Sequence, residues 1–174
     1  MITSQQFGVL LKQKTLKKNS LIEIQRITNV PISETYVKQI VKNDKGFLSK
    51  VKYVEEKDTY LIGYVKASNH EKVLMCELKD IKKIEGQDPE RYYQSFVDIL
   101  ANSNPIVITN ETNVEETVIG LTSAILDGHK ICEGMKFILK NDKNPEYNDK
   151  ILNVRMVGKT FTLKKNTGRP KTKR

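Results

Sequence analysis

The sequence is poor in the residues that most often carry metal sites and nucleophilic catalysis: its 174 residues include two cysteines, two histidines and no tryptophan. Cys76 and Cys132 stand in apolar stretches with no further Cys or His at the spacing of a metal site, and we expect both to be buried, reduced thiols. His70 lies in a polar stretch and His129 directly follows Gly128, positions typical of surface or capping residues. The sequence therefore predicts no metal centre.

Short motifs that cradle phosphate or form catalytic sites are also missing. The chain contains no GxxxxGK[ST], GxGxxG, HExxH or GxSxG. Gly158-Lys159-Thr160 is similar to the end of a phosphate-binding loop, but the upstream glycine and the strand–helix order are absent, so a hairpin turn is expected there. We therefore expect a protein that is not an enzyme and that holds no cofactor.

Long hydrophobic runs are absent too. Met1–Leu11 lacks the basic start and apolar run of a signal peptide, and no window reaches the apolar length that a bilayer-spanning helix needs. With 38% hydrophobic and 29% charged residues, the chain has the composition of a globular protein of one domain or two small ones. We expect a cytoplasmic protein without a membrane partner.

Positive charge is what the sequence has in excess, with a net charge of +9, and it is unevenly distributed. Residues 1–87 carry 16 Lys and Arg against 10 Asp and Glu, residues 88–158 carry 7 against 11, and residues 159–174 carry 7 against none. Two separated basic segments favour a polyanionic partner, first of all nucleic acid. The alternative is a generally lysine-rich composition without functional meaning.

The stretch from Gly46 to Gly86 shows the pattern of a meander of short strands. Apolar and polar residues largely alternate, which places lysines on one face and apolar residues on the other. Short strands closed by a one-turn helix are typical of a small, five-stranded, strongly bent barrel. The expected strands are Phe47–Val54, Thr59–Lys66, Lys72–Glu77 and Lys82–Glu85, with a single 3₁₀ turn at Leu78–Ile81.

The residues before this stretch add a short helix and further strands. Thr3 or Ser4 can cap a helix that ends near residue 11. Ser33–Lys42 also fits a capped helix, but its β-branched residues favour a strand that completes the barrel. We expect strands at Leu21–Ile27 and Ser33–Lys42, a break at Asn29-Val30-Pro31 and a turn at Asn43–Gly46.

This pattern resembles the small barrels of the Tudor and KOW type. The resemblance covers about a quarter of the chain, rests on the strand pattern, and implies binding of nucleic acid or of modified protein tails. In Tudor-like barrels an aromatic cage can hold a methylated cation, and Phe47, Tyr53, Tyr60 and Tyr64 lie on the expected strands. Because a barrel this small needs its aromatic rings inside, we interpret these residues as core.

After Gly86 the pattern changes to that of a small α+β unit. Asp88-Pro89-Glu90 combines a cap, a proline at the first helical position and an acidic first turn, which predicts a helix that ends before Pro105. A strand (Pro105–Thr109), a helix (Val114–Leu126) and three strands (Ile131–Lys140, Lys150–Val157 and Phe161–Leu163) are expected to follow. The predicted fold class is therefore α+β: a small bent β-barrel over residues 1–87, a linker helix and an α+β domain over residues 88–163, and a basic disordered tail over residues 164–174.

Lysines on the barrel are the first candidates for contact with nucleic acid. Lysines that alternate with apolar positions should share the solvent face and meet phosphates as mobile point charges, which gives binding without sequence preference. A merely solvated strand face is the alternative for each of them. The candidates are Lys50, Lys52, Lys66, Lys72, Lys82 and Lys83.

The C-terminal segment is the most basic part of the chain and has no large apolar residue, so we expect a disordered tail that contacts nucleic acid. Gly168-Arg169-Pro170 resembles the core of an AT-hook, whose arginine lies in the narrow minor groove of A·T-rich DNA. Thr167 stands where a hook usually has another arginine, which weakens the expected sequence preference. A solubilising tail is the alternative. The basic residues of this segment are Lys164, Lys165, Arg169, Lys171, Lys173 and Arg174.

Together these features predict a sequence-tolerant, double-stranded DNA-binding protein. Its size and lysine content resemble those of small phage accessory proteins, most of all the phage MotB type of early, nucleoid-associated DNA-binding protein. That resemblance implies a place in the cytoplasm or nucleoid of a host cell, with host nucleoid or transcription proteins as further partners. The alternatives are an RNA- or ribosome-associated KOW-like module, and a phage factor that binds a host protein through the acidic middle segment.

Overall fold

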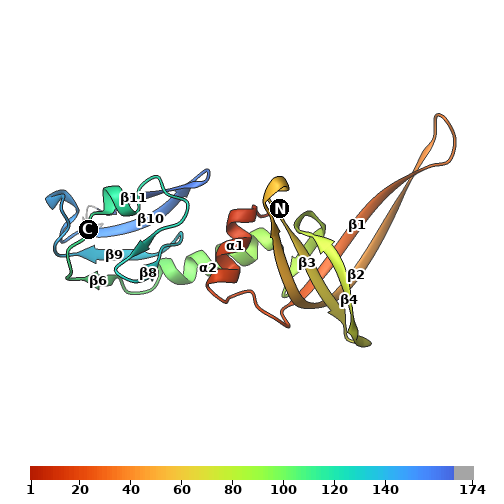
Figure 1. The fold of residues 1–174 in the computed structure, drawn as a ribbon, viewed down its shortest axis with the longest axis horizontal. Coiled ribbons are helices and arrows are strands. Elements are labelled where there is room, and N and C mark those ends of the chain that lie inside the picture. Colours follow the sequence, from red (N-terminus) through yellow and green to blue (C-terminus); the bar gives the residue numbers. More distant parts are fainter. Residues whose placement is uncertain (167–174) are drawn as a thin grey trace, which may run out of the picture. The chain divides into compact units, whose positions relative to one another are not determined.

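In the computed structural model, which describes residues 1–166, the chain is an α+β protein rich in strands (Figure 1). It divides into two compact units, the first from Met1 to Gln94 and the second from Ser95 onward. Within the described residues, no helix is both long and apolar enough to cross a membrane. The α+β class expected from the sequence is confirmed.

Helix α1 (Ser4–Lys12) opens the first unit. Thr3 caps it through a reciprocal capping box: the Thr3 hydroxyl accepts a hydrogen bond from the Gln6 backbone N–H, and the Gln6 side chain accepts one from the Thr3 N–H. Phe7 is fully buried, and its ring centroid lies 5.1 Å from that of Tyr60 in the sheet. The apolar face of α1 therefore packs on the sheet.

A five-stranded antiparallel sheet with the order β4-β3-β2-β1-β5 forms most of the first unit. The 3₁₀ turns η1 (Glu55–Lys57) and η2 (Leu78–Asp80) connect β2 to β3 and β4 to β5. The expected meander is therefore confirmed from β1 to β4, as is the one-turn helix before β5. In the described residues β4 and β5 are the two edges of the sheet, which is not closed into the expected barrel. The strands are β1 (Leu21–Pro31), β2 (Val37–Val54), β3 (Thr59–Lys66), β4 (Asn69–Glu77) and β5 (Ile81–Ile84).

The two faces of this sheet differ in character. Ile22, Ile24 and Ile62 lie on one face and are buried, and we call it the inner face. Lys50 and Lys52 lie on the opposite, outer face, where they pair with Gly63 and Leu61 of β3. The core of the first unit therefore lies on the inner face.

The expected turn at Asn43–Gly46 is wrong, because β2 runs through these residues as one continuous strand. Gly46 pairs with Ile22 of β1. It is needed for a close approach of two strands rather than for a turn, since a Cβ atom there would lie 2.5 Å from the Val65 carbonyl oxygen of β3.

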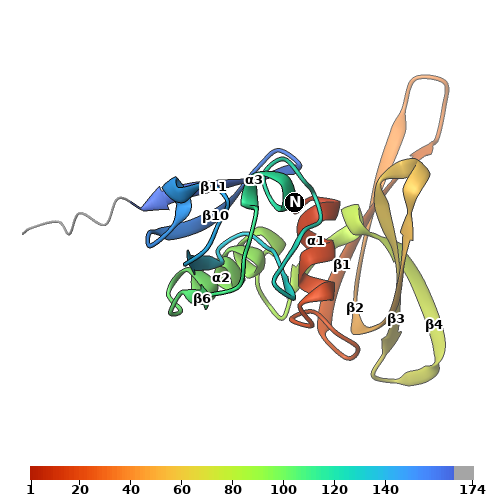
Figure 2. The same cartoon turned by 60° about the vertical axis from the view of Figure 1, so that its left-hand side comes forward.

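Strands β1 and β2 extend beyond the sheet as a long two-stranded hairpin (Figures 1 and 2). The expected break at Asn29-Val30-Pro31 is wrong, because β1 continues to Pro31, which pairs with Val37. The tip is closed by a hydrogen bond of 2.9 Å from the Ile32 N–H to the Tyr36 carbonyl oxygen.

Helix α2 (Pro89–Ala101) follows, as expected from Asp88-Pro89-Glu90, and its last residues belong to the second unit. The second unit contains a four-stranded sheet of order β11-β10-β9-β6, in which β6 and β9 are parallel and the other pairs antiparallel. A separate hairpin consists of β7 (Ile125–Leu126) and β8 (His129–Lys130). The strands of the larger sheet are β6 (Ile106–Ile108), β9 (Lys136–Leu139), β10 (Ile151–Val157) and β11 (Thr160–Asn166).

Most of the expected helix Val114–Leu126 is wrong, because α3 covers only Val114–Thr117. The chain turns at Gly120, whose φ of +85° suits glycine and whose N–H donates to the Phe161 carbonyl oxygen. Val118, Ala124 and Leu126 still reach the core without a helix, whereas Leu121 and Ile125 are 42% and 58% exposed.

Two expected strands have different limits in the structure. Ile131–Lys140 forms a strand only over β9, because Gly134 has a φ of +98° and ends the preceding loop. The last strand continues past Leu163, so Lys164 and Lys165 belong to β11 and correct the expected start of the basic tail.

Candidate nucleic-acid interface

Four cationic side chains surround one cleft of about 320 Å³ on the inner face of the first unit. It lies where β1, β2, β3 and β4 meet, and we call it the basic cleft. Asp44 is its single carboxylate, which leaves an excess of three positive charges. Its cations are Arg26, Lys42, Lys66 and Lys72, and its apolar lining comes from Ile24, Tyr64, Leu74 and Met75.

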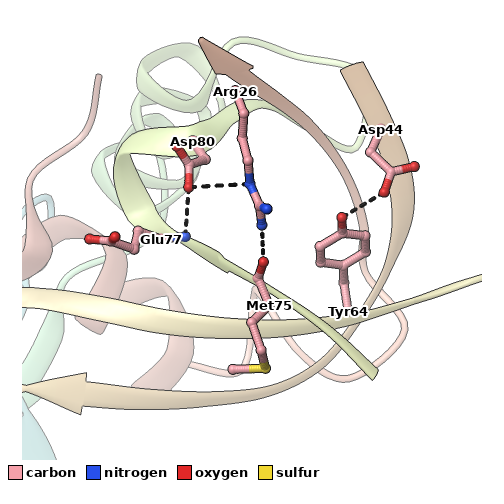
Figure 3. Close-up of polar contacts among 6 residues, drawn as sticks. All are labelled: Arg26, Asp44, Tyr64, Met75, Glu77 and Asp80. Atoms are coloured by element: carbon pink, nitrogen blue, oxygen red, sulfur yellow. Dashed lines mark hydrogen bonds and ion pairs between the residues drawn. The ribbon is translucent and has the colours of Figure 1, made fainter. Parts of the chain in front are cut away.

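Arg26 is fixed at one side of this cleft (Figure 3). Its Nη2 donates a hydrogen bond to the Met75 carbonyl oxygen of β4, and its Nε lies 3.8 Å from Asp80 Oδ2. Asp80 is itself held by η2, because the same Oδ2 accepts a hydrogen bond of 2.9 Å from the Glu77 N–H. The Arg26 side chain is 43% exposed, so a ligand can reach its remaining N–H groups.

Asp44 and Tyr64, joined by a hydrogen bond in Figure 3, both line the basic cleft. The Tyr64 hydroxyl donates a hydrogen bond of 2.6 Å to Asp44 Oδ2, and Lys66 Nζ lies 3.0 Å from Asp44 Oδ1. Burial acts to raise the pKa of Asp44, but the hydrogen bonds from Tyr64 and Lys66 outweigh it and the pKa is lowered. Burial and then the bond to Asp44 raise the pKa of Tyr64. The carboxylate is therefore occupied by its own neighbours.

Lys42 and Lys72 are the available cations of this cleft. Across residues 1–166, no carboxylate lies within ion-pair distance of either ammonium group. Both residues are exposed. A lysine without a protein partner keeps its full charge for an external anion, and binding a phosphate there breaks no existing ion pair.

The structure brings only some of the predicted lysines together. Lys66 and Lys72 line the basic cleft, whereas Lys50 and Lys52 share the outer face of the sheet. Lys82 is exposed on β5, and its neighbour Lys83 pairs with Glu23. A β-bulge between Tyr64 and Lys66 marks where the β3–β4 pairing shifts.

Arg26 and Lys42 are cleft residues that the sequence reasoning missed. They form one cross-strand pair between β1 and β2, so their side chains leave the same face of the hairpin. An unbroken β1–β2 hairpin would have aligned Arg26 with Lys42. The turn expected at Asn43–Gly46 excluded such a hairpin from the prediction.

The interpretation of the strand aromatics as core is confirmed for Tyr64 and wrong for Tyr53. Tyr64 is 3% exposed and Tyr53 is 46% exposed, whereas Phe47 and Tyr60 are half-buried. The Tyr60 ring lies between those of Phe7 and Tyr53, with centroid distances of 5.1 Å to each. Tyr64 takes part in neither ring pair and bonds to Asp44 instead, so these tyrosines do not converge on one cage.

The predicted tail residues divide at the end of β11. Lys164 pairs with Asn153 and is exposed. Lys165 Nζ lies 4.9 Å from the centre of the Tyr147 ring and 3.9 Å from Glu146 Oε2, so it is engaged within its own unit. The remaining predicted contacts, Arg169, Lys171, Lys173 and Arg174, lie outside the described residues.

Both cysteines are buried, and the described part of the chain holds no cluster of metal-ligating side chains. Cys76 and Cys132 are free thiols, 3% and 2% exposed, and burial raises the pKa of each to about 12. Among residues 1–166, no group of three or more His, Cys, Asp and Glu side chains is arranged to hold a metal ion.

Comparisons with known proteins add no relative. No family model matches the chain, and no match was found among curated proteins or among solved structures.

Proposed function

We propose that this chain is a non-enzymatic protein that binds double-stranded DNA with little sequence preference. The observation that carries the proposal is the basic cleft: four cations line it with a single carboxylate, and Lys42 and Lys72 have no partner within ion-pair distance in the described chain. Lysine ammonium groups bind phosphates as point charges without reading bases.

As part of this proposal, the first unit is a Tudor/KOW-like small barrel that binds nucleic acid. The strand order β4-β3-β2-β1-β5 and the 3₁₀ turn between β4 and β5 support this interpretation. We extend it to a phage accessory protein of the MotB type, supported by the lysine content and the net charge of +9.

The basic residues after β11 add a second electrostatic contact. Arg169, Lys171, Lys173 and Arg174 contribute four positive charges with no acidic residue among them. If Lys42 and Lys72 of the cleft and these four residues each neutralise a phosphate, the slope of log affinity against log salt is about −5.4.

The test is fluorescence anisotropy of the full chain with unrelated duplexes of equal length over a series of salt concentrations. We expect similar affinities for all duplexes and a steep loss of affinity with salt. Affinity that is insensitive to salt contradicts the proposal. Competition by duplex RNA as strong as that by duplex DNA contradicts the DNA assignment and favours the RNA-associated alternative.

A further inference from the structure

The hairpin beyond the sheet, residues 27–41, is an exposed apolar ribbon that we call the arm (Figures 1 and 2). Seven of its large apolar side chains are between 37% and 61% exposed, so they add little to the core of the first unit. A concentration of exposed apolar residues on one element marks a contact surface. These residues are Ile27, Val30, Ile32, Tyr36, Val37, Ile40 and Val41.

The tip of the arm is held in one shape by its own hydrogen bonds. The N–H groups of Ile32 and Ser33 donate to the Tyr36 carbonyl oxygen, at 2.9 and 3.2 Å. The Tyr36 N–H donates to the Ser33 hydroxyl at 3.1 Å. This closed turn presents Ile32 and Tyr36, 59% and 61% exposed, with little conformational freedom left to lose on binding.

The base of the arm lies at the basic cleft. Arg26 and Lys42, which line the cleft, form the cross-strand pair next to the Ile27–Val41 pair. Lys38 lies on the same face as Lys42, four residues nearer the tip on β2 and therefore about 14 Å away. One further cation thus lies between the cleft and the tip of the arm.

The composition of the arm fits a nucleic-acid groove. A two-stranded ribbon has the dimensions to enter a groove of duplex DNA, and apolar side chains at the end of such elements insert between base steps. Asn29 and Gln39, a cross-strand pair, add amides that can bond to base edges or sugars. Glu34 at the tip is the one carboxylate of the arm.

We propose that the arm enters a groove of duplex DNA and deforms the duplex, with Lys38 on a phosphate and Ile32 and Tyr36 wedged at a base step. This inference rests on the proposed function, because the cleft supplies the anchoring charge. Flexible pyrimidine–purine steps are the preferred sites, since their deformation costs least. The expected result of binding is a bent duplex.

The test measures energy transfer between dyes at the two ends of a short duplex when saturated with the full chain. We expect the wild-type chain to raise transfer. The variant Ile32→Ser/Tyr36→Ser should lose most of this rise while its affinity falls by less than about threefold, because the anchoring charges remain. The matched control is Ile125→Ser/Val157→Ser, which removes two apolar side chains of 58% and 63% exposure from the second unit, outside the basic cleft, and should keep the rise.

A second pair of variants tests insertion of the tip by removing a negative charge instead of apolar side chains. Glu34→Gln removes the carboxylate that would enter the groove and should tighten binding by about threefold at low salt. Glu56→Gln, in η1, is the control and should have a smaller effect. Equal effects of the two variants contradict insertion of the tip.

The outcomes separate this inference from the proposed function. If the wild-type chain binds duplexes with steep salt dependence but leaves energy transfer unchanged, the arm inference is wrong and the proposed function stands. Unchanged bending by the tip variant also overturns the inference. If the arm is shortened by replacing residues 28–40 with Asn-Gly, and only the oligomeric state in sedimentation changes, the arm joins copies of the chain and the inference is wrong.

Discussion

Tyr64 of β3 donates a 2.6 Å hydrogen bond to Asp44 of β2, and this pair sets the electrostatics of the basic cleft. Asp44 also holds Lys66, with 3.0 Å between the charged atoms. One carboxylate is therefore shared by a phenol and an ammonium group on neighbouring strands. Its negative charge is neutralised by these neighbours, so Lys42 and Lys72 can bind an external anion.

Tyr64→Phe tests this pair. It removes a hydrogen bond to a charged acceptor and should lower the free energy of unfolding by about 1.5 kcal/mol, while DNA affinity changes little. The raised pKa of Tyr64 means that its contribution is present below pH 10 and is lost as the pH rises further. The variant should therefore lose less stability above pH 10 than the wild type does in urea titrations. An identical alkaline loss in both proteins contradicts the assignment.

Gly46→Ala tests the close approach of β2 and β3. The new methyl group would lie 2.5 Å from the Val65 carbonyl oxygen, and backbone cannot move aside as a side chain can. We expect a loss of about 3 kcal/mol in the free energy of unfolding. Gly86→Ala is the control: with a φ of +77° and no atom within 4 Å of the new methyl group, it should cost about 1 kcal/mol. A Gly46→Ala variant as stable as the control contradicts the strand path described.

Asp142→Ala tests the second unit. Asp142 is 5% exposed, and its Oδ1 accepts hydrogen bonds from the Thr112 hydroxyl at 2.7 Å and the Val114 N–H at 3.0 Å. Removing the carboxylate leaves these buried donors unpaired, which should cost about 3 kcal/mol. Calorimetry should show this loss, and duplex affinity should be unchanged at a temperature where the variant is folded. A large loss of affinity in the folded variant would place the second unit in the interface.

The tail is tested by deletion of residues 167–174, because β11 already contains Lys164 and Lys165. The deletion removes four positive charges and should flatten the salt slope by about 3.6 without lowering the melting temperature. Arg169→Ala and Lys171→Ala should act alike if the tail is purely electrostatic. A selective loss of A·T-rich duplex with Arg169→Ala would support an AT-hook, and an unchanged slope after deletion would support a solubilising tail.

The sequence predicted β3, β4 and β5 well because alternation is a local signal, but it missed the length of β1 and β2. It located the 3₁₀ turn at Leu78 and the cap at Thr3 for the same reason. It failed at Gly46, because glycine can either form a turn or allow two strands to approach closely. We expected a turn, but Gly46 allows the close approach to the Val65 carbonyl oxygen. With a turn expected at Asn43–Gly46, the prediction did not contain the continuous β1–β2 hairpin.

The candidate site depended on that register. Lys66 and Lys72 were predicted as contacts from the alternation within their strands, β3 and β4. Which lysines face the same cleft depends instead on bulges and on pairing between distant residues. Arg26 and Lys42 become neighbours only when residues 16 positions apart pair across the hairpin. Helix α3 ended early for a similar reason, since the Gly120 N–H bonds to Phe161 far along the chain.

The central claim is that the basic cleft, rather than the outer face of the sheet, contacts DNA phosphates. Two variants with the same change in charge decide it: Lys42→Gln/Lys72→Gln in the cleft and Lys50→Gln/Lys52→Gln on the outer face. Lys66 is left in place, because its loss would unpair Asp44. Circular dichroism should show that both variants are folded.

The most direct measurement is the slope of log affinity against log salt for these two variants and the wild type on one duplex. Two lost phosphate contacts flatten the slope by about 1.8, and we expect this change in the cleft variant only. The same flattening in the outer-face variant, with a wild-type slope in the cleft variant, would contradict the account.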